Sequence, residues 1–226
     1  MTRSYAQLCG IAAALDVIGD RWALLIVRDL LLGPLRFSDL ATGLPGVGTN
    51  TLTDRLKQLE AAGVIQRRLL ALPDGSVVYE LTPYGRELEP ILMGLGRWGT
   101  RSMGSLAPDV ATRSRWLVAA MLAFHDERQA VSEPTTWELR LSDGPFTVRA
   151  EGTSLTVAAG APQSAEAVVT ASDQTLYLLL TGQLAPARAL EAGSVTVLGR
   201  QSMLPRLLAL FAFPAITPPS AAVPAA

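Results

Sequence analysis

The chain has 226 residues, enough for two compact domains, because single domains most often contain roughly 100–150 residues. Its 49% hydrophobic and 17% charged residues exclude the composition of a disordered protein, and its net charge of −1 excludes a strongly basic coat for nucleic acid. A single cysteine excludes an intramolecular disulfide and a cysteine-based zinc site. Because no stretch resembles a signal peptide or a membrane span, we expect a cytoplasmic protein that does not enter a membrane.

Apolar residues at helical spacing, separated by turn residues, predict four helices in the first part of the chain. They cover residues 6–18, 21–32, 37–44 and 49–62. In the last of these helices, Leu52, Leu56 and Leu59 fall on one face, and Gly63 stands where a left-handed residue closes a helix. The opposite face of this helix is polar and is predicted to be exposed.

A hairpin and a long helix follow. Residues 64–72 and 77–81 have the composition of strands and flank Pro73-Asp74-Gly75-Ser76, which is typical of a tight turn. Three helices followed by such a hairpin predict a winged helix. A further helix over about 84–103 carries an apolar stripe along one face, and this stripe needs a partner surface.

The composition changes at residues 104–109, where we place a domain boundary. Beyond it, the sequence predicts helices over 110–126, 172–181 and 203–213 and strands over 137–141, 146–150, 155–157, 168–169 and 195–198. The predicted fold class is therefore α+β, with a winged helix-turn-helix domain over 1–105 and a sheet-and-helix domain over 106–213. Residues 214–226, rich in Pro and Ala, are predicted to form a disordered tail.

Two series of motifs resemble known families. Asp20-Arg21-Trp22 precedes an aliphatic helix, and Leu35-Arg36-Phe37-Ser38-Asp39-Leu40 and the run from Leu52 to Ile65 follow in order. This series, over about 8–102, closely resembles the HxlR family of winged-helix regulators, which implies a dimer that binds duplex DNA. From about 137 to 211, chiefly in residues 176–182, 189–193 and 195–199, the chain is similar to a sterol-carrier-protein-like domain. That similarity implies a sheet-and-helix module around an apolar cavity.

Two positions depart from the HxlR pattern. Gly48 stands where a hydroxyl residue usually caps the recognition helix, so the cap falls to Gly48 itself or to Thr49. Asp74 lies at the tip of the hairpin, where no basic residue is present, and this speaks against insertion of the wing into the minor groove.

The helix over 49–62 is expected to lie in the major groove, whose base edges present a distinct pattern of donors and acceptors. Asn50 and Gln58 suit adenine, and Arg55 or Lys57 suits guanine or phosphate; their assignment stays open. The full predicted DNA-binding set is Arg36, Ser38, Thr49, Asn50, Thr51, Thr53, Asp54, Arg55, Lys57, Gln58, Arg67, Arg68 and Ser76. The alternative is an ordinary solvated helix face, which the surrounding winged-helix pattern makes the weaker interpretation.

Two apolar stripes predict a homodimer. They comprise Leu8, Ile11 and Leu15 near the N-terminus, and Ile91, Leu95 and Trp98 on the helix over 84–103. Each stripe has the alternative of packing within one chain, but a small DNA-binding module has limited surface on which to bury both. A two-fold dimer is expected to read an inverted-repeat operator with half-sites roughly 34 Å apart.

The second domain is expected to sense an apolar small-molecule effector. The residues expected to line its pocket are Trp116, Leu139, Phe146, Leu155, Leu179, Met203, Leu207 and Phe211, although core packing alone also explains their apolar character. Cys9 has two interpretations: an inert small residue in a helix, which we favour, or a redox switch, which the HxlR resemblance implies for the matching cysteine.

No acid/base, nucleophile or metal-binding arrangement is recognisable, so the sequence predicts no catalytic residues, no metal and no cofactor. The function that the sequence favours is a ligand-responsive DNA-binding transcription regulator. The alternative is a carrier of lipids or other hydrophobic molecules whose winged helix serves protein contact only. An enzyme ranks last.

Overall fold

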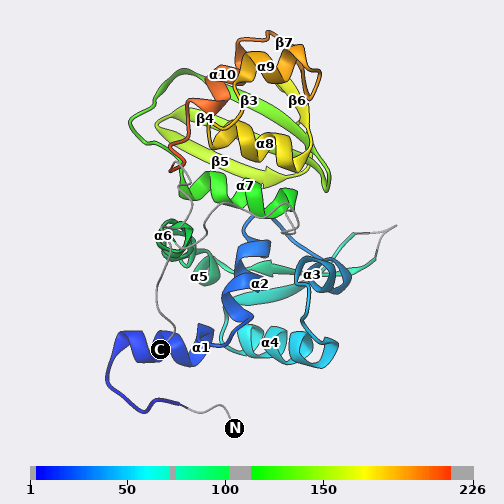
Figure 1. The fold of residues 1–226 in the computed structure, drawn as a ribbon. Coiled ribbons are helices and arrows are strands. Elements are labelled where there is room, and N and C mark those ends of the chain that lie inside the picture. The colour runs from blue at the N-terminus through cyan, green and yellow to red at the C-terminus, as the bar shows by residue number, and fades with distance from the viewer. Residues whose placement is uncertain (1–3, 72–74, 102–112, 215–226) are drawn as a thin grey trace. The chain divides into compact units, whose positions relative to one another are not determined.

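The structure is a computed structural model, and it describes residues 4–71, 75–101 and 113–214 (Figure 1). The chain divides into two compact units, Met1–Leu92 and Met93–Ala226, which are called unit 1 and unit 2 below. The division falls inside one helix, α6 (Glu89–Thr100). The predicted hairpin tip at Asp74, the linker over 104–109 and almost all of the predicted tail lie outside the described residues.

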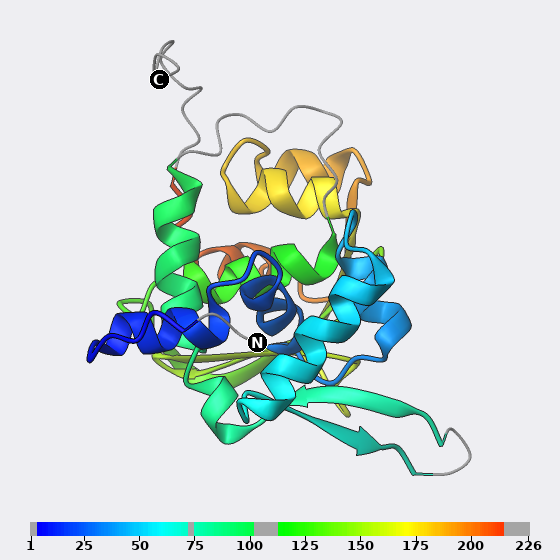
Figure 2. The same ribbon diagram turned by 90° about the horizontal axis from the view of Figure 1, so that it is seen from below.

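Unit 1 contains the predicted winged helix. Its helices and strands, in chain order, are α1 (Gly10–Ile18), α2 (Ala23–Leu30), α3 (Phe37–Gly43), α4 (Thr49–Ala61), β1 (Ile65–Leu69), β2 (Val77–Leu81) and α5 (Pro83–Arg86). Strands β1 and β2 pair antiparallel, and Leu35 adds a short bridge to Tyr79 through hydrogen bonds of 3.0 and 2.8 Å. The resulting hairpin extends away from the helices (Figure 2).

The apolar face of α4 anchors it in the core of unit 1. Leu52, Leu56 and Leu59 are 0, 2 and 1% exposed, as the spacing predicts. The helix ends in a Schellman motif, in which the amide of Val64 donates to the carbonyl of Leu59 at 2.9 Å and that of Gly63 donates to Glu60 at 3.0 Å. Gly63 has a φ of 73°, which explains why glycine occupies this position.

The single helix predicted over 84–103 is wrong, because the structure breaks it into α5 and α6 around Glu87 and Leu88. Pro90, the second residue of α6, has no amide hydrogen, and its ring would clash with the carbonyl of residue 86 in a continuous helix. A proline is tolerated in the first turn of a helix, so a new helix begins at Glu89.

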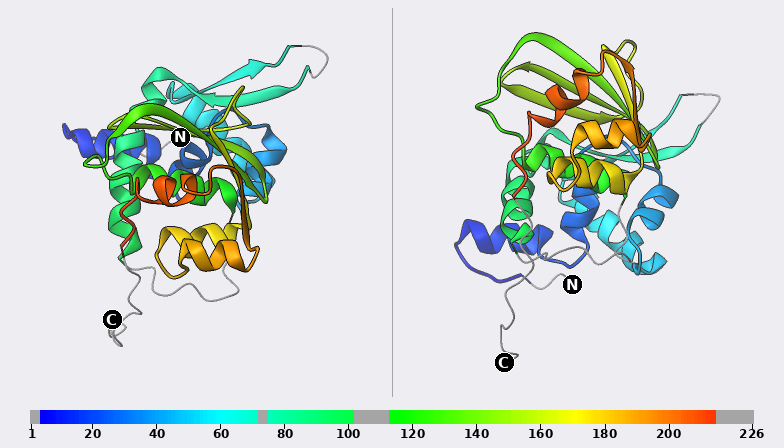
Figure 3. Two further views of the ribbon diagram at one scale, coloured as in Figure 1. Left: turned by 90° about the horizontal axis from the view of Figure 1, so that it is seen from above. Right: turned by 45° about the horizontal axis from the view of Figure 1, so that its top comes forward.

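Unit 2 is α+β, as predicted. After α7 (Ser114–Ala123) come β3 (Val131–Leu141), β4 (Gly144–Gly152), β5 (Ser154–Ala159), β6 (Ala167–Ala171), α8 (Asp173–Leu180), α9 (Pro186–Glu191), β7 (Val195–Gly199) and α10 (Met203–Leu208). The strands form one sheet in the order β5-β4-β3-β6-β7, in which only the β3–β6 pair is parallel among the described strands. Helices α8, α9 and α10 lie on one side of this sheet (Figure 3).

Three details of unit 2 differ from the sequence predictions. Strand β3 begins at Val131, six residues before the predicted start at Trp137, and α9 has no predicted counterpart. The helix predicted over 203–213 ends at Leu208. It ends there because the backbone of Leu210 and Ala212 forms hydrogen bonds with Asp126 and Phe124, at 2.9 and 2.8 Å, and leaves the helical path.

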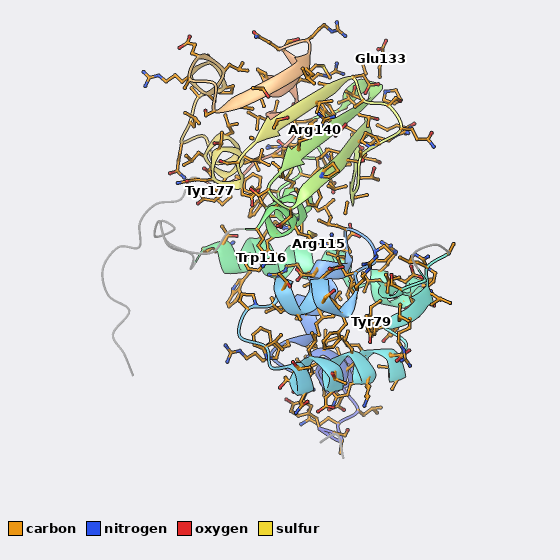
Figure 4. The ribbon with its side chains drawn as sticks, turned by 90° about the vertical axis from the view of Figure 1, so that its right-hand side faces the viewer. Tyr79, Arg115, Trp116, Glu133, Arg140 and Tyr177 are labelled. Atoms are coloured by element: carbon orange, nitrogen blue, oxygen red, sulfur yellow. The ribbon has the colours of Figure 1, made fainter. Side chains whose placement is uncertain are left out.

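The covered face of the sheet forms the core of unit 2. Trp137 and Leu139 are 0% exposed, and the indole nitrogen of Trp137 donates to the carbonyl of Met203 at 3.1 Å. On the other face of β3, Arg140 pairs with Glu138 at 2.7 Å (Figure 4). The period-two alternation of a strand thus separates apolar from charged side chains.

A buried polar network ties α7 to α8 and to the β3–β4 turn. Ser114 is 0% exposed; its hydroxyl donates to Oδ1 of Asp173 at 2.6 Å and accepts from the amide of Asp143 at 2.9 Å. The amide of Ser142 donates to the same carboxylate oxygen at 3.3 Å. This network satisfies the buried polar groups where three segments meet.

Candidate nucleic-acid interface

The polar face of α4 is open to solvent. Thr49, Asn50, Thr51, Asp54 and Lys57 are all exposed, opposite the buried leucines of the same helix. Gly48 is the N-cap and offers no side-chain hydrogen bond, which resolves the capping alternative in favour of Gly48. The first turn of α4 therefore keeps amides without a side-chain acceptor, beside the exposed hydroxyls and amide.

Three other polar side chains of α4 are engaged within unit 1. The hydroxyl of Thr53 donates to the carbonyl of Thr49 at 2.9 Å. Arg55 forms an ion pair with Asp20, from the α1–α2 turn, and donates to the side-chain carbonyl of Gln58. The side chain of Arg55 is only 22% exposed, so it lies at the edge of the open face.

The two arginines of β1 are also paired with carboxylates. Arg67 contacts Glu60 of α4 at 2.9 Å, and Arg68 contacts Glu80 of β2 at 2.9 Å. Gln66 also donates to Glu80, at 2.9 Å. These hydrogen bonds, from Gln66 first and then from Arg68, hold the pKa of Glu80 below its usual range, so Glu80 is an anion at neutral pH.

The remaining predicted DNA-binding residues lie around α3 and the hairpin. Arg36 is the exposed N-cap of α3, and its amide donates to Asp39 at 3.0 Å. Ser38 is exposed on the first turn of α3. Ser76 is half-buried, and its carbonyl accepts a hydrogen bond from the amide of Leu70 at 2.9 Å.

Asp20, Glu60 and Glu80, the carboxylates that pair with Arg55, Arg67 and Arg68, were not among the residues predicted from the sequence. The balance of eleven Arg and Lys against ten Asp and Glu in residues 1–105 indicates that carboxylates are available, but it does not say which of them bind which arginines. The hairpin register places Gln66 directly opposite Glu80, whereas a tight turn over residues 73–76 would place residue 66 opposite residue 83, so the sequence did not predict this pair. The Arg67–Glu60 pair requires the packing of β1 against α4 and has no sequence signal.

All six predicted dimer residues are exposed in the single chain. Leu8, Ile11 and Leu15 are 110, 73 and 44% exposed. On α6, Ile91, Leu95 and Trp98 are 52, 44 and 68% exposed, and their spacing of four and three residues places them on one helix face. The break in the predicted helix leaves this second stripe intact.

Most of the predicted effector-contacting residues are core residues of unit 2. Leu139, Phe146, Leu179, Met203, Leu207 and Phe211 are buried, whereas Leu155 on β5 and Trp116 on α7 are half-buried (Figure 4). Cys9 is exposed and is the N-cap of α1, so it stands at the start of the helix and not inside it.

The described residues offer neither a metal-binding cluster nor a membrane-spanning helix. Within residues 4–71, 75–101 and 113–214, no group of three or more His, Cys, Asp or Glu residues is placed to hold a metal ion. Over the same described ranges, the helices lack the length and apolar content needed to cross a membrane.

Comparison with known proteins identifies the first part of the chain. Residues 17–106 match the model of the HxlR-like helix-turn-helix family. An HTH-type transcriptional regulator of Synechocystis sp., sll1512, is 38% identical over 94 residues, which are 42% of this chain and 70% of that protein. The regulator YvaP of Bacillus subtilis is 39% identical over 87 residues, covering 38% of this chain and 81% of YvaP. The chain belongs to the HxlR-like helix-turn-helix family.

Among solved structures, the HTH-type transcriptional regulator ytcD is 38% identical and covers 42% of this HxlR-like chain and 98% of its own, with a TM-score of 0.40. Residues 123–211 match the model of the SCP-2 sterol transfer family. Both resemblances seen in the sequence are thus confirmed, and the curated relatives of the HxlR-like part are named as transcriptional regulators.

Proposed function

We propose that this HxlR-like protein is a dimeric, sequence-specific DNA-binding regulator of transcription, with α4 as the recognition helix. The observation that carries the proposal is the composition of the open face of α4. Asn50, Thr51 and Lys57 offer an amide, a hydroxyl and an ammonium group on a helix that is held in place by three buried leucines. Such groups match the donors and acceptors of base edges and phosphates in the major groove.

Asn50 is the first residue to test as a base reader. The amide of asparagine pairs bidentately with adenine, and such a contact contributes about 1–3 kcal/mol of discrimination between bases. Asn50→Ala is therefore expected to weaken binding to the selected sequence while leaving binding to scrambled DNA unchanged. Lys57→Ala, if Lys57 contacts phosphate, weakens both kinds of DNA alike.

The experiment is fluorescence anisotropy with labelled duplexes from the region upstream of the protein's own gene, against scrambled competitor at two salt concentrations. Arg149→Ala, a change on an exposed strand residue of unit 2, is the matched control. Selective, salt-sensitive binding whose selectivity falls in Asn50→Ala supports the proposal. Binding of the wild type no better than competitor favours the carrier alternative, which the SCP-2 match makes the second candidate.

The homodimer is supported by the exposed apolar stripes on α1 and α6. Large apolar side chains that are exposed in groups, such as those around Ile11 and Trp98 at 73 and 68% exposure, mark contact surfaces, whereas scattered ones are ordinary. A two-fold dimer would present two copies of α4 to an inverted repeat. Sedimentation of wild type and of Ile11→Asp tests it, because a charge in the apolar contact is expected to shift the equilibrium to monomer.

The sensing role of unit 2 is supported by the SCP-2 match over 123–211. We propose that an apolar small molecule binds among Trp116, Leu155 and the buried residues around them. A ligand that binds only the folded state raises the melting temperature with its concentration. A shift with long-chain fatty acids or sterols, and its loss in Leu155→Asp, supports an effector; an unchanged melting temperature across such a panel removes it.

The domain limits of the proposal are 1–105 for DNA binding and dimerisation and 106–213 for sensing, and the two family matches, ending at 106 and beginning at 123, support them. The names of the relatives favour a regulator over an enzyme. A cytoplasmic location is part of the same proposal, because a regulator must reach DNA.

A further inference from the structure

In the absence of DNA, the positive charges of Arg67 and Arg68 on β1 are already paired with carboxylates. Arg67 and Arg68 contact Glu60 and Glu80 at 2.9 Å each, yet their side chains remain 58 and 46% exposed. The hydrogen bond that Arg67 donates to Glu60 is the largest cause that raises the pKa of Arg67, and the pair is a charge-assisted contact of good geometry. The guanidinium groups are therefore open to solvent on one side and bound to a carboxylate on the other.

The stability of the fold gives little reason for these two ion pairs to be present. An exposed ion pair contributes only about 0–1 kcal/mol, because water and salt screen it. Glu60 also lies in the last turn of α4, where the helix dipole disfavours an anion. A neutral or basic residue would suit that position better for the helix alone, so the position of Glu60 calls for another reason.

Competition with DNA phosphate supplies that reason. A phosphate oxygen and a carboxylate oxygen accept the same hydrogen bonds from a guanidinium group. A phosphate that approaches Arg67 or Arg68 must either displace the carboxylate from Nε or bind beside its negative charge, and both reduce the gain from the contact. Displacement cancels part of the sequence-independent attraction, so a larger share of the affinity rests on base contacts by α4.

We propose that Glu60 and Glu80 are specificity-determining residues that compete with DNA phosphate for Arg67 and Arg68, lowering non-specific affinity and salt dependence. This inference rests on the proposed function, in which the recognition helix and the hairpin face DNA. The opposing interpretation is that both pairs are ordinary surface ion pairs that no phosphate approaches.

The experiment measures binding of Glu60→Gln and Glu80→Gln to a labelled random-sequence duplex between about 50 and 200 mM salt. Glu151→Gln is the matched control, because Glu151 also pairs with an exposed arginine, Arg149 at 3.0 Å, in unit 2. All three variants remove one negative charge, so the control measures the general effect of net charge. Thermal melting checks that each variant is folded.

Relative to the control, Glu60→Gln and Glu80→Gln are each expected to bind random DNA about 1.5- to fivefold more tightly. The slope of log affinity against log salt becomes steeper by about 0.9 for each phosphate gained. The ratio of selected to random affinity falls. In an Arg67→Ala background the gain from Glu60→Gln disappears, which ties the effect to that pair.

The possible results distinguish a failure of the proposed competition from a failure of the proposed DNA-binding function. Equal affinities and slopes for all three variants, with selective binding by the wild type, overturn the competition and leave the regulator intact. If neither wild type nor variants bind random or selected DNA at the lowest salt, the DNA-binding function fails, and the competition fails with it.

Discussion

The two units differ in how many large apolar side chains they expose to solvent. Of the eleven exposed large hydrophobic residues in the described part of the chain, eight lie in unit 1, including Leu8 and Ile11. In unit 2 the apolar face of the sheet is covered by its own helices, and Trp137 and Leu139 have no exposed surface. Unit 1 thus leaves more large apolar side chains open to solvent than unit 2, where Leu95 and Trp98 of α6 and Leu198 of β7 are the exposed ones among the described residues.

The largest expected effect is the difference between two Leu→Ala substitutions, one in the buried core of unit 2 and one at an exposed position of unit 1. Leu139→Ala in the core of unit 2 is expected to lower the free energy of unfolding by about 2–5 kcal/mol, because it removes buried methyl groups and leaves a cavity. Leu8→Ala, at a fully exposed position of unit 1, leaves the unfolding of a single chain unchanged. Chemical denaturation of both variants measures this difference.

The dependence of stability on protein concentration further distinguishes Leu8→Ala from Leu139→Ala. If Leu8 lies in a dimer contact, Leu8→Ala lowers stability by an amount that depends on protein concentration, because dimerisation is linked to folding by mass action. The effect of Leu139→Ala on unit 2 is independent of that linkage. A concentration-dependent loss in Leu139→Ala and none in Leu8→Ala would contradict the assignment of a dimer contact to Leu8.

A second pair of variants compares a buried hydroxyl with an exposed one. Ser114→Ala leaves the Asp173 carboxylate and the Asp143 amide without their buried partner, at a cost of about 1–3 kcal/mol. Ser38→Ala removes an exposed hydroxyl with a single long contact of 3.4 Å to Asp39, and is expected to stay within about 0.5 kcal/mol of wild type. Denaturation of both measures the difference, and equal effects would show that the network does not stabilise unit 2.

Local sequence patterns predicted most of unit 1 because its helices are amphipathic and its turn residues have one physical role each. The leucines of α4 and the left-handed Gly63 are examples, since spacing and backbone conformation fix both. The break before α6 was missed because the apolar stripe continues past Pro90. In unit 2, the early part of β3 and helix α9 were missed because short segments there depend on tertiary pairing.

The interface was predicted as a set of residues but not as a network. Exposure of Asn50 and Lys57 follows from the helical period, which places them opposite the leucines. The pairing of Arg55 with Asp20 joins residues from different elements, so neither spacing nor charge counts reveal it. Charge pairing across elements is a property of the fold, which a single sequence does not encode locally.

The recognition helix of unit 1 offers a smaller test. Gly48 caps α4 without a side-chain acceptor, its φ of −74° and ψ of 147° suit any residue, and a Cβ there would meet only Thr51 Oγ1, at 3.9 Å. Gly48→Ser is expected to raise the free energy of unfolding by a few tenths of a kcal/mol, because serine accepts from the free amides of the first turn. Thermal melting measures the gain, and Gly48→Ala, which has no acceptor, is the control. A loss of stability in Gly48→Ser would contradict the cap geometry.

The smallest expected effect on stability comes from an exposed ion pair of unit 2, Arg128–Asp126, which can be compared with the pairs of Arg67 and Arg68 in unit 1. Arg128 binds Asp126 through two hydrogen bonds of 2.8 and 2.9 Å, and this contact lowers the pKa of Asp126 from 3.8 to about 2. Because the folded pKa lies below the unfolded one, the stabilisation is present above about pH 4 and is lost as the pH falls toward 2. Titration by NMR is expected to return Asp126 toward its ordinary pKa in Arg128→Ala, while Glu127→Gln leaves it low. An Asp126 pKa near 3.8 in the wild type would mean that Arg128 does not hold the pair in solution. Charge pairing built into the fold would then be confined to contacts between separate elements, such as Arg67–Glu60 and Arg68–Glu80 in unit 1.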